Sequence, residues 1–161
     1  MSSATTVRLV ISSEVRLVDV VHAASETMAA IAGFEADDAL NVGIAVREAV
    51  INAIVHGNKM DPTRKVEVSL HARPRSIRAR VRDQGSGFDS GATPDPTVGD
   101  NRMRSSGRGI LVMSAFVDSV DFKFREGHGM EVTLKKNRAG RKATRSTRPS
   151  VAAMDNGGIE R

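Results

Sequence analysis

One stretch of the chain, from Asn41 to Asn58, combines the apolar character of a core helix with three polar side chains at helical spacing. Glu48, Asn52 and His56 follow one another at intervals of four residues, which places them on one face of an α-helix. Most other positions are Val, Ile or Ala, so the helix should be buried on most sides. Burying a carboxylate and a carboxamide costs free energy unless both groups are hydrogen-bonded or bind a ligand. The stretch therefore predicts either a satisfied polar pair in a core or a binding site.

The ends of the helices also have signals in the sequence. We call the helix predicted for Asn41 to Asn58 the organising helix. We expect Asp37 or Asp38 to cap its start, because a short polar side chain can accept from the first free backbone N–H groups. Gly57 should end that helix by allowing a tight exit. A second helix is predicted before it, running to about Ala32, and Ser12 or Ser13 should cap its start in the same way.

Alternation of apolar and polar residues predicts five strands, most of them joined by short turns. They fall at about residues 7–11, 66–70, 77–81, 120–124 and 130–134, with a further helix at 110–116. Hairpin connections favour antiparallel pairing. The expected fold is α/β (α+β), a two-layer sandwich in which helices cover one face of a mostly antiparallel mixed sheet.

Three arginines, Arg78, Arg80 and Arg82, alternate with apolar residues along one of these strands. Such a row would suit a nucleic-acid surface. A solvated face of the sheet is the simpler interpretation, and we favour it.

Two glycine-containing segments follow the organising helix. DQGSG (Asp83 to Gly87) comes directly after a predicted strand, and SGRGI (Ser106 to Ile110) opens a predicted helix. The residues between them, 85–107, are rich in Gly, Pro, Asp and Ser. A connection of that length in a compact domain is usually functional or disordered.

In this order and spacing, the three stretches resemble the N, G1 and G2 boxes of the GHKL superfamily of ATP-binding proteins. The segment EAVINAIVHGN and the short length of the chain look most like the anti-sigma-factor serine/threonine kinases of bacterial partner-switching systems. The resemblance covers roughly Val7 to Leu134. It implies the Bergerat (histidine-kinase-like ATPase) fold, ATP and Mg²⁺ as cofactors, and an ATP lid at residues 85–107.

The resemblance assigns roles on the organising helix. Glu48 matches the family's catalytic glutamate, and a carboxylate there could deprotonate a serine hydroxyl or orient a water. Asn52 matches the family's magnesium ligand, and its amide oxygen suits a hard cation. His56 could touch phosphate, or it could complete its hydrogen bonds locally. Gly57 completes this part of the expected ATP site.

The glycine segments supply the rest of the expected ATP site. Asp83 matches the residue that reads adenine, because a carboxylate can accept from the exocyclic amine. Gly85 and Gly87 would let the backbone approach the base or sugar. At the start of the later helix, backbone N–H groups favour phosphate. The residues expected there are Arg104, Ser106, Gly107, Arg108, Gly109 and Ile110. The family carries its arginine at the position of Ser105, so whether Arg104 or Arg108 reaches the γ-phosphate stays open.

Several functions compete. The first is a kinase that phosphorylates an anti-anti-sigma (STAS-type) partner and also acts as an anti-sigma factor. The alternative is an ATP-binding module that sequesters a sigma factor with little turnover. A detached histidine-kinase catalytic domain is disfavoured by Glu48 and by the lack of a phosphoacceptor helix pair.

Charge is distributed unevenly. Residues 1–134 hold 16 Lys and Arg against 17 Asp and Glu, whereas residues 135–161 hold 8 against 2. We therefore expect a kinase domain at 1–136 and a basic, disordered tail at 137–161. The tail could bind nucleic acid, but we expect no direct nucleic-acid partner.

The composition bears on the cellular compartment in which the protein works. The chain has no cysteine, no evident signal peptide and no long apolar run, so we expect a cytoplasmic protein without a membrane partner. Dimers are common in the family, so a homodimer is a further expectation.

Overall fold

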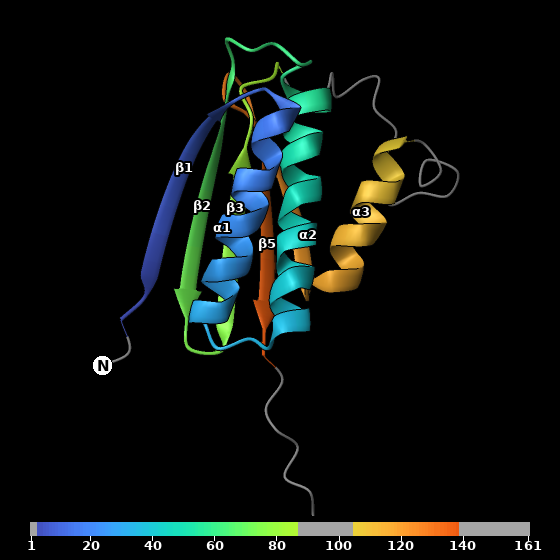
Figure 1. Ribbon diagram of the computed structural model, residues 1–161. Helices are drawn as coiled ribbons and strands as arrows, with labels where there is room; N and C mark the ends of the chain where they lie inside the picture. Colours follow the sequence, from blue (N-terminus) through green and yellow to red (C-terminus); the bar gives the residue numbers. More distant parts are fainter. Residues whose placement is uncertain (1–2, 87–104, 139–161) are drawn as a thin grey trace, which may run out of the picture.

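The computed structural model describes residues 3–86 and 105–138 (Figure 1). The elements follow in the order β1 (Thr5–Ser12), the 3-10 helix η1 (Val15–Leu17), α1 (Val18–Ile31), α2 (Ala36–Asn52), the π-helical turn η2 (Ala53–Gly57), β2 (Lys65–Arg73), β3 (Ser76–Arg82), α3 (Ser105–Phe116), β4 (Ser119–Arg125) and β5 (Gly129–Asn137). Most of the predicted lid and most of the predicted tail lie outside the described residues.

The five strands form one sheet in the order β1-β2-β3-β5-β4, and every pairing is antiparallel. The helices lie on one face of this sheet, with α2 between α1 and α3 (Figure 1). The predicted two-layer sandwich is therefore confirmed. Within the described residues the sheet is purely antiparallel rather than mixed.

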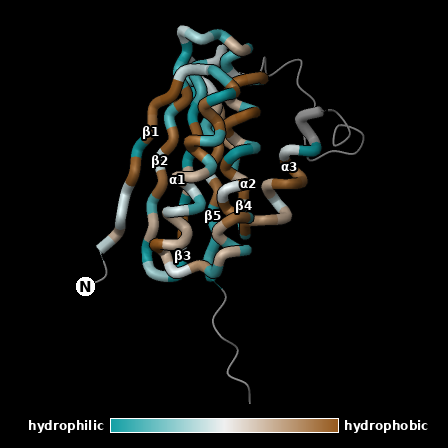
Figure 2. The backbone as a smooth tube through the Cα atoms, viewed as in Figure 1, coloured by the Kyte–Doolittle hydropathy of each residue, from teal (hydrophilic) through white to brown (hydrophobic). Residues whose placement is uncertain are grey.

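The core lies between the sheet and the helices. Val68, Val81 and Val132 stand directly opposite one another on three neighbouring strands, and all three are buried. Their polar sequence neighbours point to the other face, as the period of two requires. Figure 2 shows this alternation as a change between hydrophobic and hydrophilic colour along the strands. At the edge strand β4, Phe122 and Phe124 remain 43% and 42% exposed.

The organising helix begins at Ala36, before both predicted cap residues, and ends in a π-helical turn. Its N-cap is Glu35, which makes no side-chain cap hydrogen bond, so the prediction of a cap by Asp37 or Asp38 was wrong. Both aspartates lie instead in the first turn, where negative charge is stabilised by the helix dipole. Ala36–Gly57 is long and apolar enough to cross a membrane by length and composition alone. Half of its most apolar window is buried in the fold, as in a core helix.

Ser13 does not cap the helix that follows it. Its hydroxyl donates to the carbonyl of Arg64 at 2.9 Å and accepts from Asn58 at 2.8 Å. The chain after β1 enters a 3-10 helix at Val15 before α1 starts, and Glu14 occupies the N-cap position without a side-chain cap bond. Ser13 thus joins the end of β1 to the connection before β2.

The face of the sheet opposite the helices carries an ion cluster around one buried carboxylate. Glu131 is only 6% exposed and accepts a hydrogen bond from the Arg82 guanidinium at 2.8 Å. Arg80 and Arg125 lie 3.8 and 4.0 Å from the same carboxylate. Burial alone would raise the pKa of Glu131, but the hydrogen bond from Arg82 and the neighbouring guanidinium charges hold it below its ordinary value. The ionised form of Glu131 therefore stabilises the fold.

Replacing Glu131 by Gln should make stability less dependent on acid pH. Because the folded-state pKa is lowered, the stabilisation is present above the unfolded pKa of about 4.3 and is lost as pH falls through the folded pKa. We expect Glu131→Gln to unfold about 1 kcal/mol more easily at neutral pH. Its free energy of unfolding should also fall less steeply below that pH than the parent's.

Denaturant unfolding at a series of pH values measures both effects. Glu67→Gln is the matched control, since Glu67 lies on the same face but is 52% exposed and meets Arg82 only at 3.8 Å. Equal pH profiles for the parent and Glu131→Gln would show that the cluster does not stabilise the fold.

Candidate functional site

The end of the organising helix meets the end of β3 at a buried carboxylate. Asp83 follows β3 directly and is 4% exposed. Its Oδ1 atom accepts from the backbone N–H groups of Gly85 at 2.9 Å and Met130 at 3.0 Å. Its own N–H donates to the carbonyl of Met130 at 3.0 Å. Burial raises the pKa of the Asp83 carboxyl, and the two accepted hydrogen bonds oppose that rise.

Three glycines surround this carboxylate. A Cβ atom on Gly57 would collide with the Asp83 side chain, and one on Gly129 would collide with its carboxylate and carbonyl. A Cβ atom on Gly85 would collide with the carbonyl of Gly57. The structure thus brings together Asp83, Gly57 and Gly85 from the predicted site and adds Gly129.

Gly57 is the last residue of the helical stretch, as predicted, but the predicted tight exit at Gly57 itself was wrong. The chain turns two residues later, where Lys59 and Met60 have φ values of 57° and 59°. Gly57 lies within the π-helical turn, where its missing side chain leaves room for Asp83. A π-helical turn within a longer helix often accompanies a functional site.

A second contact joins the organising helix to α3. A Cβ atom on Gly109 would lie 3.1 Å from the Asn52 amide nitrogen and 3.4 Å from Glu48 Oε2. The backbone of α3 near its start therefore lies directly against both polar side chains. Glu48 is 25% exposed at its side chain, and Arg47 approaches its carboxylate at 3.9 Å. The pair thus lies at the edge of the core and is partly exposed.

Asn58 is a site residue that the sequence analysis did not single out. It is fully buried, and its amide nitrogen donates to the Ser13 hydroxyl at 2.8 Å and to the Lys65 carbonyl at 3.0 Å. Its amide oxygen accepts from the N–H of Gln84 at 2.7 Å. Asn58 therefore ties the end of the organising helix to β1, β2 and the residue after Asp83.

The other predicted residues fall into three groups. His56 is half-buried in the π-helical turn, beside Gly57. On α3, Arg108 is exposed and Ile110 packs against the core, while the side chain of Ser106 and the surroundings of Gly107 lie outside the described residues. Gly87 and Arg104 also lie outside them. Within the described ranges, no three His, Cys, Asp or Glu residues group as a metal site would require.

Comparison with known proteins identifies relatives of similar size. The chain is 34% identical to the anti-sigma F factor of Geobacillus thermodenitrificans over 110 residues, which is 66% of this chain and 75% of that protein. It is 28% identical to the anti-sigma F factor of Anoxybacillus flavithermus over 103 residues, covering 63% of this chain and 70% of that protein.

The fold also has a solved counterpart. The crystal structure of the RsbU and RsbW domains of a Mycobacterium tuberculosis protein matches with a TM-score of 0.60 and 19% sequence identity. The match covers 83% of this chain but only 32% of that longer one, and at this identity it supports the fold alone. Residues 11–136 match the histidine kinase-like ATPase domain, so the chain belongs to that family of ATP-binding domains.

Proposed function

We propose that this protein is an ATP- and Mg²⁺-dependent serine/threonine protein kinase that phosphorylates a STAS-type anti-anti-sigma partner and also acts as an anti-sigma factor. The observation that carries the proposal is the pair of Glu48 and Asn52, one helical turn apart and both against the backbone of Gly109. A base and a metal ligand next to the start of a helix are the parts that phosphoryl transfer requires.

The adenine end of the site would form around Asp83. Its Oδ1 atom already accepts two backbone hydrogen bonds, so Oδ2 is the oxygen that remains for a ligand. The exocyclic amine of adenine can donate to this oxygen, whereas guanine presents a carbonyl at the same ring position and would be repelled. The three surrounding glycines leave space for the carboxylate, and the fixed Oδ1 contacts orient it before any ligand arrives.

The phosphate end would form between Asn52 and the start of α3. The Asn52 amide oxygen is a suitable protein ligand for Mg²⁺, which usually keeps several waters and takes further oxygens from phosphates. When bound, the ion would neutralise charge on the phosphates during transfer. Backbone N–H groups in the first turn of α3, near Gly107, would face the phosphates, because the first N–H groups of a helix are free to donate. Arg104 and Arg108 are the candidates for the γ-phosphate.

Glu48 would act on the nucleophile. A carboxylate at the edge of the core can accept the proton of a serine or threonine hydroxyl as that oxygen attacks the γ-phosphorus. A histidine acceptor needs no such base, which favours a hydroxyl substrate. The bond between the γ-phosphorus and the bridging oxygen breaks, and ADP leaves.

The partners follow from the relatives. Two of them are named anti-sigma F factors, and the matched region spans 70% or more of each, so a sigma factor is the proposed binding partner. The proposed domain spans residues 1–136, with residues 137–161 proposed to lie outside it, although β5 runs on to Asn137. We infer a soluble protein that works in the cytoplasm, where its sigma factor would be found.

The second candidate function is an ATP-binding module that sequesters the sigma factor with little kinase turnover.

Glu48→Gln should separate these two functions. Removing a negative charge near the triphosphate should leave ATP binding unchanged or slightly tighter, whereas transfer to the partner should fall about 10²–10⁴-fold if Glu48 is the general base. Asn52→Ala should instead weaken binding of Mg·ATP. Phosphorylation with labelled ATP and a binding titration measure the two effects.

Glu67→Gln is the charge-matched control, since Glu67 lies on the open face of the sheet. Transfer by Glu48→Gln at the parental rate would remove Glu48 from the chemistry. A parent that binds ATP and a sigma factor but phosphorylates no STAS-type protein would favour the module.

Gly129→Ala should damage the adenine end. Gly129 has a φ of 81°, and its added Cβ would collide with Asp83, whereas Gly127 has a φ of 73° and nothing within 4 Å of an added Cβ. Both alanine variants should lose about 1–2 kcal/mol of stability through the positive φ. Only Gly129→Ala should lose more and also weaken ATP binding.

Thermal unfolding and nucleotide titration of the two variants, side by side, measure this difference. If Gly129→Ala and Gly127→Ala lost equal stability and bound ATP equally, contact with Gly129 would not position Asp83.

A further inference from the structure

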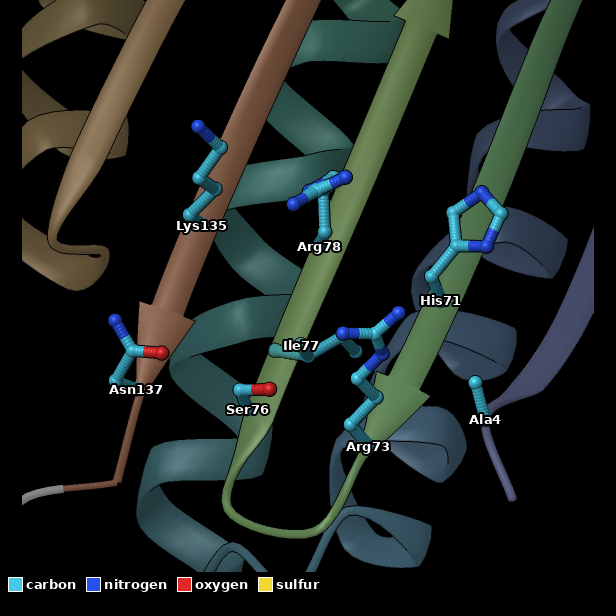
Figure 3. A pocket seen from close by; sticks show the side chains of 8 residues that line it. All are labelled: Ala4, His71, Arg73, Ser76, Ile77, Arg78, Lys135 and Asn137. Atoms are coloured by element: carbon cyan, nitrogen blue, oxygen red, sulfur yellow. The ribbon is translucent and has the colours of Figure 1, made fainter. Parts of the chain in front are cut away.

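The open face of the sheet concentrates positive charge at one end. His71 on β2, Arg78 on β3 and Lys135 on β5 stand directly opposite one another in the strand register. Figure 3 shows these side chains on neighbouring strands. Directly opposed residues have Cβ atoms about 5 Å apart, and like charges at that spacing destabilise a sheet. The neighbouring charges of Arg78 and Lys135 therefore repel each other unless a negative group lies over them.

Neighbouring residues add to this charge. Arg8, Arg73, Arg78 and Arg80 come close enough to His71 to lower its pKa, after burial, which is the larger cause. The side chain of Thr6 contacts the His71 ring at 3.0 Å. The strand on each side, β1 and β3, and His71's own strand β2 thus supply the cations around this imidazole.

The two ends of the open face differ in how many carboxylates lie near their positive charges. At one end, Glu131 and Glu67 lie near Arg80, Arg82 and Arg125. At the other, among residues 3–86 and 105–138, no carboxylate comes within ion-pair distance of Arg8, Arg73 or Arg78. Lys135 has only a contact with Asp121 at 3.9 Å, where the lysine is 45% exposed.

A pocket lies within this uncompensated end. Its volume is about 160 Å³, several times the roughly 30 Å³ that a water molecule occupies in the liquid. It is lined by Ala4, His71, Arg73, Ser76, Ile77, Arg78, Lys135 and Asn137, as Figure 3 shows. Its polar side chains are two guanidiniums, an ammonium, an imidazole, a hydroxyl and an amide. All of these can donate hydrogen bonds, and none is a carboxylate.

We propose that this pocket, on the face of the sheet opposite the helices, binds a phosphate group carried by a small molecule or by a phosphorylated side chain. Arginine suits a phosphate because its planar fork can donate two parallel hydrogen bonds. Lys135, Ser76 and Asn137 line the same pocket and offer donors to the other oxygens. The bound anion would also relieve the repulsion between Arg78 and Lys135.

A phosphate group fits better than a nucleic acid strand. Proteins that bind single-stranded nucleic acid on a sheet use aromatic side chains on which the bases stack. None of the eight residues that line the pocket is Phe, Tyr or Trp. The site is also separate from the proposed ATP site, because it lies on the opposite face of the sheet from α2 and α3.

The His71 ring gives a local reporter. Its NMR signals can be followed while inorganic phosphate, pyrophosphate or a phosphoserine peptide is added to the full chain. We expect saturable shifts and a rise in the His71 pKa, because an anion stabilises the protonated ring against the four surrounding arginines. The ligand that saturates at the lowest concentration identifies the source of the phosphate.

Two single-charge variants make the test specific. Arg78→Gln should weaken binding roughly tenfold or more, as expected for loss of a charge-assisted contact. Lys123→Gln removes the same charge from β4 on the same face but outside the pocket, and it should bind like the parent. Equal weakening in the two variants, or His71 signals that never saturate with any of the three probes, would overturn the proposal.

Discussion

The site depends on burying the carboxylate of Asp83 against backbone with no side chains in the way. Two backbone N–H groups compensate for that burial, and three glycines from separate parts of the chain leave the space. The contact fixes the end of the organising helix against the end of β3 and the start of β5. A carboxylate held in this way is oriented in advance, so a ligand that donates to it need not order it.

The same constraint links the fold to the proposed chemistry. The organising helix lies between α1 and α3 over the middle of the sheet, so most of its surface is core. Its remaining stripe carries Glu48 and Asn52 against α3 and leads through the π-helical turn to Asp83. The buried side chain of Asn58 then ties this end to Ser13 after β1, to Lys65 at the start of β2 and to Gln84 after β3. The adenine and phosphate ends of the proposed site are therefore set by one helix.

Local patterns were sufficient to predict the strands and the layer arrangement, because the alternation of Val68 or Val81 with polar neighbours reflects which face is buried. The same reasoning failed at the helix starts, where Asp37, Asp38 and Ser13 found other roles. The contacts of Gly129 with Asp83 and of Asn58 with Ser13 and Gln84 were also missed, since they join residues 26 to 46 positions apart. A signal existed for Gly129 in the turn Glu126-Gly127-His128-Gly129, but a turn glycine does not reveal what packs on it.

Calorimetric titration of nucleotide into the full chain measures whether the proposed ATP site binds and selects its nucleotide. We expect saturable binding of ATP that tightens with Mg²⁺, little binding of GTP, and weaker ATP binding by Asp83→Asn, by roughly 1.5–3 kcal/mol for a lost charge-assisted hydrogen bond. Absence of ATP binding by the folded parent, or equal binding of ATP and GTP, would contradict this expectation.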